Sequence, residues 1–300
     1  MSVVDTMAPR FDRVRAYFAP ANRSAGAVTL MSAAAIAGFD VATPSAPWID
    51  LGWVSGFARS CETKVTAVKS GAPLTTAMQV RSEVDASVAL AFESWGKLQL
   101  ALSAGTQQVN LLQATAAVSL VSGSTATVLQ MAATDAATFA VGQMVAVDVD
   151  YAGTTGYVGS GVDAAYVKTA LTDVDYVRRV TLNVARVASI SGGAVTLETA
   201  LVAGVPTSAM KVSSVVGFCD REGSSFFQQW SGLFVAEGQQ GEQVVWYYPL
   251  LQTMSGIAEK VAKDAGGFEA MRLRGAFRAL PVVDPMDGEM AVCWRIFVAG

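Results

Sequence analysis

The segment WIDLGWVSGFARSCETKVTAVKSGAPLTTAMQVRSEVDASV, residues 48–88, predicts β structure. Its start gathers large apolar side chains around two glycines, and the residues from Lys64 to Val68 alternate between polar and apolar. Such alternation is typical of a strand with one buried face. A glycine and a proline in residues 69–73 predict a turn, and residues 78–88 alternate again. We therefore expect a strand on each side of this turn.

Two further segments have patterns that favour helices. Residues 90–102 carry apolar side chains at mixed two-, three- and four-residue steps, and Gly105 predicts the end of that helix. Residues 253–263 predict a second helix, because Glu259 precedes Lys263 by one helical turn.

The chain closes with strand patterns. Residues 271–280 alternate between arginine and apolar side chains, residues 284–288 predict a turn, and residues 290–298 predict the last strand.

Residues 123–214 differ from the sequence on either side. Aromatic residues become sparse there, and Ala, Val, Thr and Gly dominate. Short strand patterns recur, and Ser191-Gly-Gly193 predicts a β-hairpin. We interpret this segment as a small all-β domain inserted into the first one, and the alternative is one larger β fold without a separable insert.

The expected fold is mainly β, with a β-sandwich or β-barrel core, one or two flanking helices and the inserted all-β domain. The core comprises residues 25–122 and 215–300. Residues 1–24 are expected to form an N-terminal arm, extended or partly helical, because four apolar residues in it have helical spacing: Phe11, Val14, Tyr17 and Phe18.

Composition argues against an enzyme. The chain has 300 residues and no histidine, so triads and metal sites that need an imidazole are excluded. It is 52% hydrophobic and only 15% charged, with a net charge of −4. A surface with so few charges favours burial against partner subunits. The longest weakly polar run, residues 25–39, is too short to span a bilayer, so no membrane insertion is expected.

The remaining reactive side chains form no strong motif. Ser94 and Lys97 have the Ser-x-x-Lys spacing of penicillin-binding proteins, but the companion motifs are missing. Carboxylates form three short pairs: Asp148/Asp150, Asp173/Asp175 and Asp284/Asp287. Each of the first two pairs could hold a hard cation such as calcium, because residues i and i+2 of a strand share a face, although solvated loops are the simpler interpretation. Cys61, Cys219 and Cys293 are isolated, and we expect buried free thiols. No catalytic, cofactor-binding or metal-binding residue is predicted.

Two regions of the chain resemble the tail tube (major tail) proteins of tailed bacteriophages. The resemblance is carried by residues 48–57 and 64–73, and by FRALPVVDPMDGEMAVCWRIF at residues 277–297. It covers residues 40–120 and 215–300, and the insert departs from the family pattern.

The resemblance implies a structural role in the virion tail. Subunits of this family form rings, usually hexameric, that stack into a tube through which double-stranded DNA passes during ejection. The implied partners are copies of the chain and other tail proteins, after synthesis in the cytoplasm of the bacterial host. The insert would most naturally decorate the outside of the tube.

Arginine and tryptophan side chains are the candidates for subunit contacts: Arg13, Arg15, Trp48, Trp53, Arg272, Arg274 and Arg278. The last three share one face of a predicted strand. They would form an inter-subunit row of ion pairs or contact packaged DNA, and the alternative is a solvated face.

Three other functions stay open from the sequence. One is another virion component, such as a capsid decoration or tail terminator protein. The second is a carbohydrate-binding β-sandwich that stacks sugars on aromatic side chains: Trp230, Trp246, Tyr247 and Tyr248. The third is a hydrolase based on carboxylates or on the Ser94/Lys97 pair.

Overall fold

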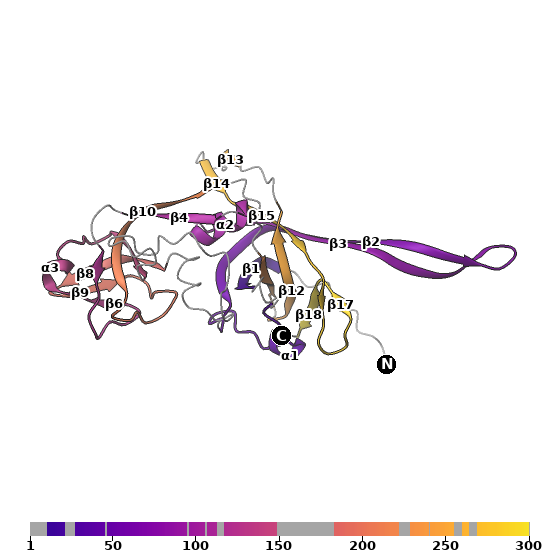
Figure 1. Cartoon of the computed structure of the whole chain (residues 1–300), viewed down its shortest axis with the longest axis horizontal. Coiled ribbons are helices and arrows are strands. Elements are labelled where there is room, and N and C mark those ends of the chain that lie inside the picture. Colours follow the sequence, from indigo (N-terminus) through magenta and orange to yellow (C-terminus); the bar gives the residue numbers. More distant parts are fainter. Residues whose placement is uncertain are drawn as a thin grey trace. The chain divides into compact units, whose positions relative to one another are not determined.

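The chain folds into two compact units rich in β strands (Figure 1). Unit 1 comprises Met1–Ala21, Gly26–Ser94 and Phe227–Gly300, and unit 2 comprises Asn22–Ala25 and Trp95–Phe226. The computed structural model describes residues 11–21, 28–45, 47–94, 96–105, 107–112, 117–148, 183–221, 229–239, 241–254, 260–263 and 269–299. The predicted mainly β fold is confirmed.

Unit 1 is built on a closed ring of antiparallel strands. Six strands pair in the order β11-β1-β2-β3-β15-β12, and β12 pairs back to β11. A sheet that pairs back on itself forms a barrel. A further strand, β18, pairs with the first half of β12. The bounds are β1 Phe11–Pro20, β2 Ile49–Ser70, β3 Thr75–Phe92, β11 Gln229–Gly238, β12 Gln243–Thr253, β15 Arg274–Ala279 and β18 Trp294–Val298.

Aromatic side chains from distant strands meet on one face of this ring. The ring of Phe18 on β1 lies 5.3 Å from Phe277 on β15 and 5.9 Å from Phe234 on β11, between centroids. Phe18 and Phe277 contact each other although β2 and β3 separate their strands in the sheet order. We therefore place these rings inside the barrel.

A second buried cluster covers the outer face of β1, β11 and β12. Tyr17 and Tyr247 lie in it, together with Ile36 from the short helix α1, Ala33–Ala37. The hydroxyl of Ser32 accepts a hydrogen bond from the backbone N–H of Ala35 and caps this helix. Alternate residues of β1 are thus buried on opposite faces.

Burial on both faces corrects the prediction for the N-terminal arm. Phe11–Pro20 is a strand between β11 and β2, and Ala16, Tyr17, Phe18 and Ala19 have no exposed surface. The helical alternative is therefore wrong for these residues. A strand that is buried on both faces has a continuous apolar run in place of the alternation that identifies a strand in the sequence. Residues 1–10 lie outside the described part of the chain.

Strands β2 and β3 continue far beyond the barrel as a long hairpin, seen at the right of Figure 1. They contain 22 and 18 residues and are joined by a turn around Gly71. All residues from 61 to 85 are exposed. We call residues 61–85 the hairpin arm. The two strands and their turn agree with the sequence prediction.

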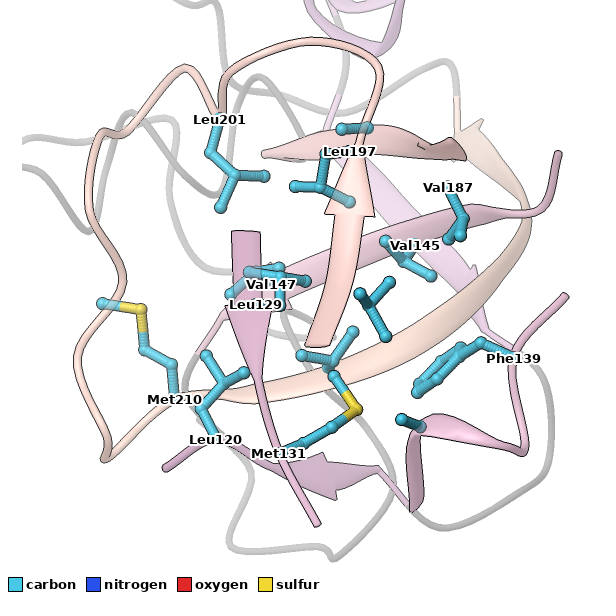
Figure 2. Packing of buried hydrophobic residues seen from close by; sticks show 14 residues of the cluster. Leu120, Leu129, Met131, Phe139, Val145, Val147, Val187, Leu197, Leu201 and Met210 are labelled. Carbon is cyan, nitrogen blue, oxygen red and sulfur yellow. The ribbon is translucent and has the colours of Figure 1, made fainter. Parts of the chain in front are cut away.

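Unit 2 has its own apolar core (Figure 2). Its main sheet has the order β4-β10-β7-β8-β9-β6, and β5 pairs with β10. Figure 2 shows Leu129, Val145 and Val187 directed into a common interior. The bounds are α2 Lys97–Ala104, β4 Gln107–Leu112, β5 Val118–Ser119, β6 Val128–Gln130, α3 Ala133–Ala136, β7 Met144–Asp148, β8 Val184–Ser191, β9 Ala194–Leu197 and β10 Lys211–Arg221.

Unit 2 is wider than the predicted insert. Residues 123 and 214 both lie inside it, because α2 and β4 precede the first boundary and β10 continues past the second. The predicted hairpin at Ser191-Gly-Gly193 is confirmed as the turn between β8 and β9.

Both helix predictions need correction. The first helix is confined to α2 and ends at Gly105, whose φ of +67° suits a glycine. Leu90 and Phe92 belong instead to β3. Within 253–263, Thr253 ends β12, and β13, Lys260–Lys263, pairs with β14, Glu269–Arg272, where Lys263 faces Glu269.

A short β-hairpin near the C-terminus completes unit 1. Strand β16, Val282–Val283, pairs with β17, Met290–Ala291, around the predicted turn. The closing strand 290–298 is therefore interrupted, because β17 and β18 have different partners. None of the described helices has the length and apolarity needed to cross a bilayer.

Candidate subunit interface

Three predicted interface residues come together on the barrel surface. Arg13 and Arg15 lie on β1, and their guanidinium carbons are 5.6 and 5.4 Å from the ring centroid of Trp53 on β2. Arg15 also donates a hydrogen bond of 3.1 Å from Nε to Asp50 and forms an ion pair with it. This hydrogen bond raises the pKa of Arg15 above its ordinary value. The group is a charged surface cluster with partners inside the chain.

Trp48 belongs to the core and not to the surface. It is 7% exposed and packs edge-to-face against Phe39 and Tyr247, at centroid distances of 6.1 and 6.3 Å. The side chain that the sequence singled out for a partner is therefore covered by its own chain.

The three C-terminal arginines are exposed, but they do not share one strand as predicted, because Arg272 ends β14 whereas Arg274 and Arg278 lie on β15. Arg272, Arg274 and Arg278 alternate with buried residues. Arg278 forms an ion pair with Asp85 on the neighbouring strand β3, with 3.3 Å between Nε and Oδ1. At least this arginine therefore has its counter-charge within the same chain.

The proposed sugar platform is a core cluster. Trp230, Tyr247 and Tyr248 are at most 1% exposed. Burial raises the pKa of Tyr17, Tyr247 and Tyr248, because it disfavours the phenolate. Side chains with so little exposed surface cannot stack against a sugar. Trp246 is partly exposed, but its ring packs against Phe57 at 5.1 Å between centroids, so the structure does not form the predicted platform of four rings.

The hairpin arm carries the largest group of exposed apolar side chains in unit 1. Six of its large apolar residues are between 38% and 71% exposed: Val65, Val68, Leu74, Met78, Val80 and Val84. Paired residues of a hairpin share a face. Val68 pairs with Met78, so both point to the same side of the arm, whereas Val65 pairs with Arg81 on the opposite side.

Two of the three acidic side chains on the arm, Glu83 and Asp85, form ion pairs. Lys64 lies 3.9 Å from Glu83, and Asp85 pairs with Arg278. Within the described part of the chain, Arg81 forms no ion pair. Glu62 and Lys69 form none either among the described residues, so the arm presents unpaired charges of both signs, Arg81 among them.

An acidic turn projects between β16 and β17. The carboxylate of Asp284 accepts a hydrogen bond from the N–H of Met286, and that of Asp287 accepts one from the N–H of Glu289, both at 2.9 Å. A backbone hydrogen bond of 2.8 Å from Gly288 to Asp284 closes the turn. Met286 at its tip is 85% exposed. The Asp284/Asp287 pair thus organises a loop.

A pocket of about 1040 Å³ opens where the arm leaves the barrel. Arginines from three strands line it: Arg59, Arg81 and Arg295. Arg59 donates a hydrogen bond of 3.1 Å to the hydroxyl of Tyr248. The other walls include Glu83, Val84, Pro281 and the segment from Glu289 to Cys293.

Two of the cysteines line the same pocket. Cys61 is exposed, which corrects the expectation of a buried thiol, because the arm has no covering layer. Cys293 is partly buried, and burial raises the pKa of its thiol. The surroundings of Cys219 lie outside the described side chains.

Of the Ser94/Lys97 pair, the structure describes the side chain of Ser94, and that of Lys97 lies outside the described side chains. The hydroxyl of Ser94 donates a hydrogen bond to the backbone oxygen of Leu51 at 2.9 Å. Asp148 is 3% exposed at the end of β7, and Asp150, Asp173 and Asp175 lie outside the described residues. Among the residues that the structure describes, no cluster of three or more His, Cys, Asp or Glu side chains could hold a metal ion.

Sequence reasoning missed the arm as an exposed surface and the pocket at its base. Alternation predicts a strand but does not say whether its apolar side is covered. The available signal was the density of Val, Met and Leu in residues 65–80, where acidic residues are absent. No family model and no curated protein matches the chain.

Proposed function

We propose that this chain is a structural subunit that assembles with copies of itself into the tail tube of a bacteriophage. The hairpin arm is the observation that carries the proposal. A lone two-stranded hairpin is marginally stable in water, yet residues 61–85 are all exposed and include six large apolar side chains. Packing against a neighbouring subunit would cover these side chains and the open strand edges.

The barrel gives such an assembly a stiff building block. Its strands pair around a closed ring, so copies can stack without rearranging the core. A net charge of −4 suits a conduit that binds DNA weakly. The assembly we propose is a stack of rings, hexameric as in the resembling family. It lies in the virion tail, contacts other tail proteins and lets double-stranded DNA pass.

Negative-stain electron microscopy over a concentration series tests the proposal. We expect hollow rings or tubes with a bore close to the width of duplex DNA. Monomers at every concentration would contradict the proposal. Closed trimers or single rings that never stack would favour a capsid decoration or tail terminator protein instead.

A further inference from the structure

We infer that the acidic turn at residues 284–288 of one copy inserts into the arginine-lined pocket of a second copy. The inference deepens the proposed function and rests on it, because it names the two surfaces through which copies associate. The turn and the pocket are both complete within the described part of unit 1.

Charge is the first match between the two surfaces. The pocket wall carries three guanidinium groups and two carboxylates, so cations outnumber anions. One of the acids, Glu83, is already close to Lys64, and the other is Glu289. Arg81 and Arg295 form no ion pair within the described part of the chain. The turn carries Asp284 and Asp287 and no cation. Bringing these carboxylates to the arginines would pair charges that are unmatched in a single copy.

Shape and polarity provide the second match. The tip of the turn exposes Met286, a flexible apolar side chain that adapts to irregular cavities. The pocket offers it Val84, Pro281 and Val292. Pockets of roughly 300–1,000 Å³ hold drug-sized ligands, so about 1040 Å³ accommodates the tip of a tight turn.

The turn of the same chain cannot fill the pocket. Pro281 lies just before the turn and Glu289 just after it, and both line the pocket wall. The pairing of β16 with β17 fixes the two ends of the turn between these residues. Folding the tip back into a cavity bounded by its own ends would break that pairing, so a turn that fills the pocket comes from another copy.

The turn is also held in shape before it binds. Two side-chain hydrogen bonds and the backbone bond from Gly288 to Asp284 fix it. A preformed loop loses little conformational entropy on binding. In the rings that we propose, each copy inserts its turn into one neighbour and receives the turn of another, and such head-to-tail contacts build rings or filaments.

Cross-linking with the natural pocket cysteine tests the geometry directly. A full-chain variant with Met286→Cys, and with Cys293→Ser so that Cys61 is the one remaining cysteine of the pocket, is treated with a short bismaleimide. We expect a ladder of covalent oligomers, formed by position 286 of one copy and Cys61 of the next. The ladder should disappear when Cys61→Ser is added. As a matched control, Val202→Cys places an exposed thiol on unit 2 and should give no ladder that depends on Cys61.

Complementation then tests the charges. One chain carries Arg81→Glu and Arg295→Glu, which disable the pocket. The other carries Asp284→Asn and Asp287→Asn, which remove both turn charges, while asparagine can still accept the turn hydrogen bonds. In analytical ultracentrifugation, each variant alone should associate at least about tenfold more weakly than the unmodified protein, because each lacks one side of the charge pairing.

Mixing the two chains separates a head-to-tail contact from a general loss of charge. The first chain keeps its acidic turn and the second keeps its arginines, so an equimolar mixture should recover association as dimers. Association of each variant as strong as that of the unmodified protein would overturn the inference, and so would a ladder that survives Cys61→Ser. If the unmodified protein never associates, the proposed function itself fails.

Discussion

Gly193 allows two backbone segments of unit 2 to approach more closely than a residue with a side chain would permit. It lies in the turn between β8 and β9, where an added Cβ would be 2.3 Å from the backbone oxygen of Met131. Its own carbonyl accepts a hydrogen bond of 2.9 Å from the N–H of Met131. The clash involves backbone on both sides, so no side-chain rotation relieves it.

We therefore expect Gly193→Ala to lower the free energy of unfolding by about 1–3 kcal/mol. Urea denaturation followed by circular dichroism measures the change. Ser191→Ala, two residues earlier and exposed, serves as the control and should stay within about 0.5 kcal/mol. Equal stabilities of the two variants would mean that the turn moves freely away from Met131.

Three buried tyrosines make stability depend on alkaline pH. Tyr17 donates a hydrogen bond of 2.7 Å to the carbonyl of Val41. Burial raises the pKa of Tyr17, Tyr247 and Tyr248 in the folded chain. The folded state therefore holds these protons more tightly than the unfolded state, where tyrosine has a pKa of about 10. Their contribution is complete below that value and is lost as pH rises above it.

We expect the free energy of unfolding to fall above about pH 10, by at most about 1.4 kcal/mol per pH unit for each tyrosine. Denaturant titrations at several alkaline pH values give the slope. Tyr17→Phe keeps the ring and removes the ionisable hydroxyl. The free energy of unfolding of this variant should therefore fall less steeply with pH, by the contribution of one tyrosine. If Tyr17→Phe leaves this pH dependence unchanged, the Tyr17 hydroxyl does not have a raised pKa in the folded chain.

The hairpin arm is a separate structural element, and its removal should separate folding from assembly. Thr63 and Val84 face each other across the two strands. Replacing residues 64–83 with Asn-Gly would join this pair through a two-residue turn. Because residues 61–85 are all exposed, the barrel core keeps its contacts and we expect a Tm within a few degrees of the full chain. Rings and tubes should be lost.

Thermal unfolding and electron microscopy of the same preparation check both statements. A shortened chain that still forms tubes would remove the arm from the assembly mechanism. A large fall in Tm would show that the arm supports the barrel, contrary to its exposure.

Local sequence patterns correctly predict several strands and turns. The glycine pair before β9 and the turn around Gly71 were predicted because turn residues act through their own backbone angles. The helix prediction over 253–263 is wrong at residues 260–263, which form β13, because the Glu259–Lys263 spacing suits a helix and the partner strand β14 leaves no local signal.

Long-range pairing could not be predicted in the same way. The barrel closes through contacts of β1 with β11 and of β11 with β12, which join the two ends of the chain. No local period encodes such partners. For the same reason the pocket was missed, because its walls come from β2, β3 and the C-terminal segment.

Unit 2 contributes no strand to the barrel, although it interrupts unit 1 in the sequence. Strand β3 pairs with β2 and β15, and β11 pairs with β1 and β12. Every one of these partners belongs to unit 1. The apolar core of unit 2 is likewise made from its own residues. Each unit therefore has the contacts that it needs to fold.

We accordingly expect a chain in which a flexible Gly/Ser linker replaces residues 95–226 to fold and to assemble into tubes of the same bore. The isolated segment 95–226 should unfold cooperatively in urea, since its described residues already form a buried apolar cluster of their own. Electron microscopy compares the outer diameters of the tubes. Tubes that become thinner while the bore stays constant would identify unit 2 as an external decoration. Loss of assembly with an intact barrel would instead make unit 2 part of the subunit contacts.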